Sequence, residues 1–269
     1  MDYIEKFTGS LRFAGRSENT IRAYESDLRQ IENTLNKTLV EARPLELLDY
    51  FTNLKLETST INRRVDSIHK YYSFLMDMEV ISKDPSKGIE APKEEQKEVR
   101  YTPSKTEVAA MIKATKNAKT KAIVTVLSET GLRFSEFANI KLEDLSDVIV
   151  VKGKGNKIRR VPLSPKAKEA IEEYLKVRKD GDDTLFTSDR GTKLDNSSVY
   201  RSLRTLAKKA GIEKWNEVEP HCLRRFAVSE AHKKGLPIGI IEKMFGHSFG
   251  VEKKNYLSVT DEELLSMVQ

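Results

Sequence analysis

The chain has 269 residues, of which 38% are hydrophobic, so it can build one large domain or two ordinary ones with buried cores. It holds no run of about 18 apolar residues to span a bilayer, and its start, MDYIEKFTGS, lacks the basic and apolar regions of a signal peptide. We therefore expect a cytoplasmic protein with no membrane partner. One cysteine, Cys222, and four histidines show no zinc-binding spacing, so neither a metal site nor redox chemistry is predicted.

The net charge of +6 is unevenly distributed along the chain. Residues 1–100 hold 16 Lys and Arg against 18 Asp and Glu, whereas the remainder holds 31 against 23. A basic second half fits a polyanion such as nucleic acid, because neutralised phosphates release their counterions. Charge alone indicates a lysine-rich solvated surface equally well.

The first ninety residues have the periodicity of helices that share one core. Ser17 is a candidate N-cap for a helix from about Glu18. One helix is expected before it, a third begins at Pro44, and a fourth begins at about Ser59. These segments predict a four-helix domain over residues 1–87. Its expected core consists of Ile4, Phe7, Leu11, Ile21, Tyr24, Leu28, Ile31, Leu35, Leu47, Leu48, Phe51, Leu54, Ile61, Val65, Ile68, Tyr72 and Leu75, with Met78 as a further candidate.

Three polar residues near the start of the fourth helix lie largely off its apolar stripe. They are Asn62, Arg63 and Arg64, and two of them are cationic. We consider them candidate DNA contacts, although the first ninety residues alone favour a solvated helix face.

The segment DPSKGIEAPKEEQKEVRYTPS, residues 84–104, interrupts the helical pattern with three prolines, a glycine and mixed charge. This composition is typical of an extended linker. We therefore predict a linker over residues 88–103 and a second domain over residues 104–269.

The second domain is expected to be mainly helical with one small hairpin. Two β-branched runs, 148–151 and 158–163, flank Gly153, Gly155 and Asn156, which suit a turn. The turn region carries three lysines, Lys152, Lys154 and Lys157, of which Lys152 and Lys157 are further candidate DNA contacts. Helices are expected at about 104–118, 121–130, 164–179, 195–210, 221–234 and 237–245, which predicts a mainly α fold.

No cofactor motif accompanies these elements. Gly153-Lys154-Gly155 lacks both the third glycine of a dinucleotide fingerprint and the G-K-[ST] ending of a P-loop. The chain also lacks a G-x-S-x-G elbow for serine acyl chemistry. What remains is four separated blocks of phosphate-competent side chains: TGLRFSEF, KGKGNK, PHCLRR, and FGHS with NYL.

In this order, behind a helical domain and a linker, the four blocks resemble the tyrosine recombinases, the family of phage-type integrases and Xer-type resolvases. The resemblance covers nearly the whole chain and is strongest from Thr130 to Tyr256. It implies an N-terminal SAM-like core-binding domain, a C-terminal catalytic domain with a short tail helix, and no metal, ATP or other cofactor. Two departures are small: Arg225 stands where many members have histidine, and Phe245 where leucine is usual.

The resemblance assigns roles to seven residues by their positions in the family blocks. A tyrosine would be the nucleophile, and two arginines and a histidine would hold the scissile phosphate. A second histidine would act as base, and a hairpin lysine would act as general acid. Taken singly, each residue has a simpler structural explanation, and only their joint order and spacing indicate chemistry. The implied catalytic residues are Arg133, Lys154, His221, Arg224, His247 and Tyr256, with Glu136 as a supporting carboxylate.

The reaction that the resemblance implies is site-specific cleavage and rejoining of duplex DNA. The expected partner is DNA with recombination sites, bound by a homotetramer on two duplexes whose protomers are monomeric or weakly associated when free. Two alternatives remain: a type IB topoisomerase-like enzyme and a non-catalytic helical DNA-binding regulator. The complete catalytic set argues against the regulator, and the integrase-like domain order argues against the topoisomerase.

Overall fold

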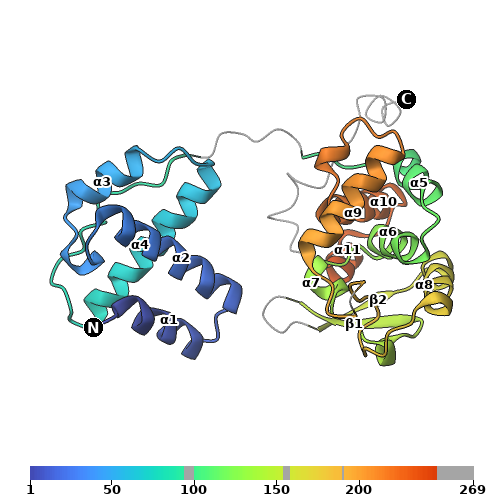
Figure 1. Cartoon of the computed structure of the whole chain (residues 1–269), viewed down its shortest axis with the longest axis horizontal. Helices are drawn as coiled ribbons and strands as arrows, with labels where there is room; N and C mark the ends of the chain where they lie inside the picture. Colours follow the sequence, from blue (N-terminus) through green and yellow to red (C-terminus); the bar gives the residue numbers. More distant parts are fainter. Residues whose placement is uncertain (94–99, 154–157, 190, 247–269) are drawn as a thin grey trace. The chain divides into compact units, whose positions relative to one another are not determined.

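The computed structural model describes residues 1–93, 100–153, 158–189 and 191–246. The chain divides into two compact units, Met1–Lys97 and Glu98–Gln269, which we call the first and second units (Figure 1). The described part is mainly helical with one two-stranded sheet, as the sequence predicts. None of its helices combines the length and the apolar character that crossing a membrane requires.

The first unit contains four α-helices in the expected order. They are α1 (Tyr3–Phe13), α2 (Glu18–Leu35), α3 (Pro44–Thr52) and α4 (Thr58–Asp77), with a 3₁₀ turn at Leu39–Glu41. The predicted N-cap is confirmed, because the Ser17 side chain accepts a hydrogen bond from the Thr20 amide. Asn36 ends α2 in the left-handed conformation, which asparagine tolerates better than most residues.

The core of the first unit matches the predicted helix faces except at Leu48 and at Met78, which is 58% exposed. The structure exposes 42% of Leu48, which was expected in the core, and buries Tyr50 instead. Leu47, Tyr50 and Phe51 follow the spacing i, i+3, i+4 of a single helix face, and Leu48 lies off that face. Ile89 also joins this core, so the first unit extends into the region predicted as linker.

The second unit begins with two helices, α5 (Lys105–Ala114) and α6 (Ala118–Thr130), and a single turn, α7 (Phe134–Phe137). Strands β1 (Val148–Lys152) and β2 (Ile158–Pro162) follow. The other helices of its described residues are α8 (Pro165–Val177), α9 (Asn196–Lys209), α10 (Pro220–Lys233) and α11 (Ile238–Phe245), with 3₁₀ turns at Leu142–Asp144 and Trp215–Glu217.

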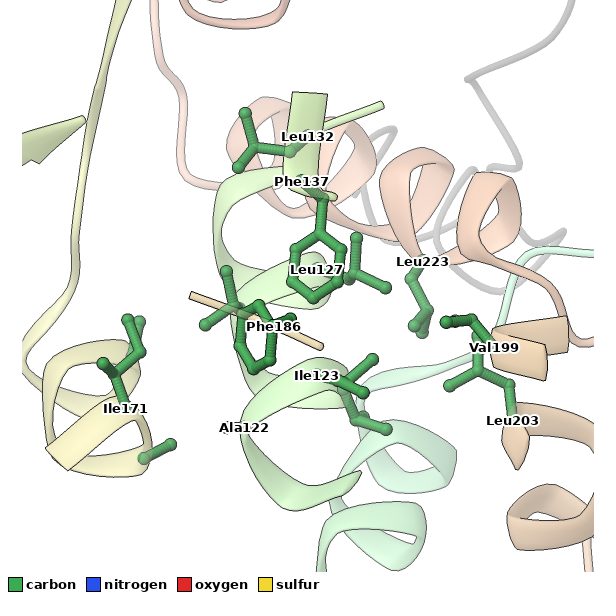
Figure 2. Close-up of a cluster of buried hydrophobic side chains, with 14 of the residues drawn as sticks. Ala122, Ile123, Leu127, Leu132, Phe137, Ile171, Phe186, Val199, Leu203 and Leu223 are labelled. Atoms are coloured by element: carbon green, nitrogen blue, oxygen red, sulfur yellow. The ribbon is translucent and has the colours of Figure 1, made fainter. Parts of the chain in front are cut away.

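Helix α6 lies at the centre of the second unit and packs against α5, α8 and α10. Figure 2 shows its residues among side chains from α7, α8, α9 and α10. Eight of its thirteen residues are buried, more than one face of an amphipathic helix would supply. The buried side chains that Figure 2 labels are Ala122, Ile123, Leu127, Leu132, Phe137, Ile171, Phe186, Val199, Leu203 and Leu223.

The hairpin pairs β1 with β2 in antiparallel register, from Val148 opposite Pro162 to Lys152 opposite Ile158. Successive residues of a strand point to opposite faces, so burial alternates along β2. The inward positions are Arg159 and Val161, whereas Ile158 is 65% exposed. The second strand therefore buries an arginine, Arg159, and exposes the apolar residue just before it, Ile158.

Candidate active site

The first arginine block forms the end of α6 and the turn into α7. Gly131 ends α6 with a φ of +58°, and its amide donates to the Leu127 carbonyl. A Cβ at Gly131 would lie 2.5 Å from a ring carbon of Phe245, so glycine is required by both conformation and space. This close approach brings the end of α6 against the end of α11, and Arg133 follows two residues later.

Glu136 joins two arginines from different elements. Its carboxylate accepts hydrogen bonds from the Arg133 amide (2.8 Å) and from Arg133 Nη1 (3.1 Å). Arg159 donates to both carboxylate oxygens through Nη1 (2.5 Å) and Nη2 (2.6 Å). Burial opposes the charged form of Glu136, but these bonds from Arg159 and Arg133 outweigh it and lower the pKa of the carboxyl.

Arg224 lies on α10 and is fully buried. Its Nη1 donates to the Gly131 carbonyl and its Nη2 to the Phe245 carbonyl, so it bridges the ends of α6 and α11. Buried arginines need such partners, because an uncompensated buried charge is costly.

Three successive carbonyls at the end of α11 each accept a hydrogen bond from a different arginine. Arg159 Nε donates to Met244 (2.9 Å), Arg224 to Phe245, and Arg133 Nη2 to Gly246 (3.1 Å). The last carbonyls of a helix lack partners within the helix and carry partial negative charge, which favours cations there. Arg133, Arg159 and Arg224 are thereby gathered from three elements around one helix end.

His221 lies in the first turn of α10, three residues before Arg224, so the two share a helix face. Burial, followed by the positive charges of Arg225, Arg224, Arg100 and Arg133, lowers the pKa of His221 to about 4. Its imidazole is therefore neutral at pH 7 in the chain without DNA.

Arg225, which departs from the family pattern, ties the beginning of the second unit to α10. It is buried, and its Nε and Nη2 donate to the Tyr101 carbonyl at 3.2 and 2.6 Å. Tyr101 in turn donates through its hydroxyl to Glu107 on α5. Arg225 therefore has a structural role, and its charge also acts on the neighbouring His221.

The structure brings together Arg133, Glu136, His221 and Arg224 of the predicted set. Lys154, Lys157, His247 and Tyr256 lie outside the described residues, and their roles stay predictions. Lys152 is exposed at the end of β1. Within the described ranges, no three His, Cys, Asp or Glu side chains are grouped so that they could hold a metal ion.

The predicted DNA contacts of the first unit are engaged within that unit. Arg64 is 7% exposed and donates to the Tyr50 hydroxyl (2.5 Å) and to Gln30. Arg63, whose side chain is 41% exposed, pairs with the buried Asp27, and Asn62 is partly buried. DNA contact by these residues stays a prediction, and only Arg63 of the two arginines presents a large part of its side chain to solvent.

Arg159 was missed in the sequence analysis. A signal for it existed, because Arg159 is in phase with Val161, the other inward residue of the second strand, and with the buried Leu163 just after that strand. Ile158, the apolar residue just before Arg159, hides this alternation in the sequence because it is exposed. Its partner Glu136 lies 23 residues earlier, and no local pattern joins the two.

Models of known families cover most of this chain. The phage integrase family matches residues 104–263, and the N-terminal SAM-like domain of phage integrases matches residues 4–79. These matches fall on the second and first units respectively and define the class as the tyrosine recombinases.

Individual proteins agree with that class. Tyrosine recombinase XerD of Oceanobacillus iheyensis is 30% identical, over 99% of this chain and 96% of its own length. A lambda integrase dimer bound to a COC′ core site has the same fold, with a TM-score of 0.77, 15% identity, and coverage of 96% of either chain. A lambda integrase tetramer bound to a Holliday junction gives a TM-score of 0.74 and 16% identity, over 93% of this chain and 77% of that one.

The chain belongs to the phage integrase family and is a tyrosine-type site-specific DNA recombinase. The predicted family and two-part fold are thus confirmed, with a SAM-like first unit and an integrase catalytic second unit. These comparisons do not favour the topoisomerase-like or the regulator alternative.

Proposed function

We propose that this recombinase cleaves one DNA strand by attack of the Tyr256 hydroxyl on the scissile phosphate. The bond from the tyrosine oxygen to phosphorus forms as the bond to the 5′ oxygen breaks, leaving a 3′-phosphotyrosyl link and a free 5′ hydroxyl. Attack by a 5′ hydroxyl from the other DNA then reverses these steps. One phosphodiester replaces another, so the exchange balances without hydrolysis.

The observation that carries this proposal is the gathering of Arg133 and Arg224 at the ends of α6 and α11. Negative charge grows on the non-bridging phosphate oxygens in the five-coordinate transition state, and guanidinium groups offer paired N–H donors that stay charged. Both arginines are already held by backbone carbonyls, so little reorganisation is needed when the phosphate arrives. His247 is proposed as a further donor.

Proton transfer is assigned to His221 and Lys154. A tyrosine hydroxyl has a pKa near 10, so a base is needed near neutral pH. His221, neutral because burial and the surrounding arginines lower its pKa, is able to accept that proton. The negative charge of a bound phosphate would offset the arginines and strengthen this base. Lys154 would give a proton to the departing 5′ oxygen.

The decisive experiment is to identify the covalent link. The chain is incubated with DNA flanking its own gene, covalent adducts are captured under denaturing conditions, and the DNA-linked peptide is sequenced by mass spectrometry. We expect attachment at Tyr256, and we expect Tyr256→Phe to bind the captured DNA without forming an adduct. An adduct formed by Tyr256→Phe, or no adduct with the wild-type chain, would refute the assignment.

The partner is DNA, and we propose that four protomers assemble on two duplexes in the cytoplasm. The lambda integrase tetramer on a Holliday junction has this fold, which supports the proposal. The second unit also has a groove lined by residues of α5, α6, α8, α10 and α11. Three lysines and two glutamates line it, and its apolar residues are Val108, Ala109, Phe226, Ala227, Ala231, Leu236, Met244 and Phe245.

We propose that this groove receives the C-terminal tail of a neighbouring protomer. The tail, residues 259–269, carries Asp261, Glu262 and Glu263 before the apolar Leu264, Leu265 and Val268. An apolar stripe on so short a segment needs a docking surface to be stable. The groove offers apolar area, and its lysines, Lys105, Lys166 and Lys234, suit the acidic residues.

Truncation after Ser258 tests the tail. The truncated chain should bind single sites as the full chain does but lose synapsis and recombination, measured by gel shift and by product formation on two-site DNA. Lys234→Glu should weaken synapsis in the same direction, because it reverses one charge of the groove. Recombination by the truncated chain at the full-length rate would contradict a role in assembly.

A further inference from the structure

The burial of Arg159 is difficult to explain by core stability. Strand β2 leaves Ile158 65% exposed and turns Arg159, 9% exposed, inward. A shift of one residue in register would reverse both, since neighbouring strand residues occupy opposite faces. Buried ion pairs add little net stability compared with apolar side chains of similar size. The position therefore points to a role for the guanidinium.

Arg159 uses three of its N–H groups to join three elements. Nη1 and Nη2 bind both oxygens of Glu136 on α7, and Nε binds the Met244 carbonyl at the end of α11. A planar guanidinium can make such a bidentate pair and a third bond in a fixed geometry, which lysine cannot. Arg159 itself belongs to β2, so it locks the base of the hairpin to α7 and α11.

The bonds from Arg159 to Glu136 determine how Glu136 binds Arg133. With both carboxylate oxygens held by Arg159, Glu136 makes one side-chain bond to Arg133, from Nη1 at 3.1 Å. Nη2 of Arg133 is directed instead to Gly246 (3.1 Å). Without Arg159, the carboxylate could turn and pair with both Nη groups of Arg133, which would occupy donors that the phosphate needs.

The same guanidinium packs against the chain just before His247. A Cβ added to Gly246 would lie 3.4 Å from both Cδ and Nη1 of Arg159 and 3.7 Å from Nη1 of Arg133. Gly246 also has a φ of +64°, which glycine adopts without strain. The two arginines and the end of α11 are therefore in close contact.

We infer that Arg159 is a positioning residue for phosphate activation, which holds Glu136 so that Arg133 keeps its donors for the scissile phosphate. It acts through Arg133 and does not itself touch the DNA. This inference rests on the proposed function, because it assumes that Arg133 neutralises the phosphate.

The test measures single-turnover adduct formation at saturating protein, on nicked DNA carrying the captured site. Two versions of the DNA are compared: a normal scissile phosphodiester, and a methylphosphonate in which a methyl group replaces one charged oxygen. Removing a donor aimed at developing charge typically slows an enzyme about 10² to 10³-fold. Arg159→Gln, which only misplaces the donor, should slow cleavage of the phosphodiester by about 10-fold or more.

On the methylphosphonate the effect of Arg159→Gln should shrink to within about 3-fold, because less charge needs Arg133. Arg160→Gln is the matched control: it removes a guanidinium from the exposed face of the same strand and should leave both rates unchanged. Arg159→Lys keeps the charge beside Glu136 and is the variant to use if Arg159→Gln fails to fold. It should show the same preference for the methylphosphonate.

Two results would overturn the inference: a wild-type rate for Arg159→Gln on the phosphodiester, or equal slowing on both substrates. Equal slowing would mean a general structural role. If the wild-type chain forms no adduct on either substrate, the proposed function itself fails, which is a distinguishable outcome.

Discussion

The lowered pKa of His221 makes a stability prediction that needs no DNA. The folded chain holds this pKa at about 4, whereas an unfolded chain returns it to about 6.5. As pH falls from 6.5 towards 4, the unfolded state therefore takes up a proton that the folded state does not. The contribution of His221 is fully present above pH 6.5 and is lost as pH falls through this window.

The size of the loss follows from the two pKa values. At pH 5 it amounts to up to about 2 kcal/mol relative to pH 7.5, and less where salt and the partly exposed ring screen the arginines. The variant His221→Gln cannot titrate and should lack this loss. Its other ionisable groups are unchanged, so the difference in pH dependence between the two chains isolates His221.

Trp215 provides the measurement, because it is the single tryptophan and lies in the second unit, between α9 and α10. Urea unfolding is followed by its fluorescence at pH 7.5 and pH 5.0 for both chains. We expect the free energy of unfolding of the wild type to fall by about 1 to 2 kcal/mol more than that of His221→Gln. Equal pH dependence, or a smaller fall for the wild type, would refute the lowered pKa of His221.

Two further predictions concern residues whose roles the sequence assigned. Lys154→Ala should slow cleavage of normal DNA far more than cleavage of DNA with sulfur as the 5′ bridging atom, because a thiolate leaves without a proton; equal slowing would move the general acid elsewhere. Arg64→Gln should lower the free energy of unfolding of the first unit by about 2 kcal/mol or more, because it leaves Asp27 buried with one cation fewer. Arg63 is more exposed, so Arg63→Gln should lower the free energy of unfolding by less. Urea unfolding followed by circular dichroism compares the two variants, and equal losses of stability would contradict the burial argument.

The sequence predicted the long periodic elements well because their pattern repeats over several turns. Helix α2 begins at Glu18 and α11 ends at Phe245, as expected. Helix α7 was not predicted, since four residues are too short to show a period. The error at Leu48 has a similar origin, because adjacent leucines on a short helix leave the inward face ambiguous.

The candidate site was predictable as a set of residues but not as a set of contacts. Motif order identified Arg133 and Arg224, whereas the acceptors that hold them are backbone carbonyls, which sequence letters do not distinguish. The pair of Arg159 with Glu136 depends on the register of the hairpin and on where α7 ends. Such long-range contacts follow from tertiary packing, which local patterns do not encode.

The backbone acceptors also explain why the site stays strongly positive. The Gly131 and Phe245 carbonyls fix Arg224 without cancelling its charge, because they are neutral dipoles. Glu136 supplies a full negative charge, but Arg133 and Arg159 share it. Three guanidiniums held against one carboxylate leave a positive excess, and that excess has two consequences. The charges of Arg224 and Arg133 add to burial, the largest cause, and to the charge of Arg225 in lowering the pKa of the neighbouring His221, which keeps that base neutral. The excess also provides the field into which an anionic phosphate is drawn.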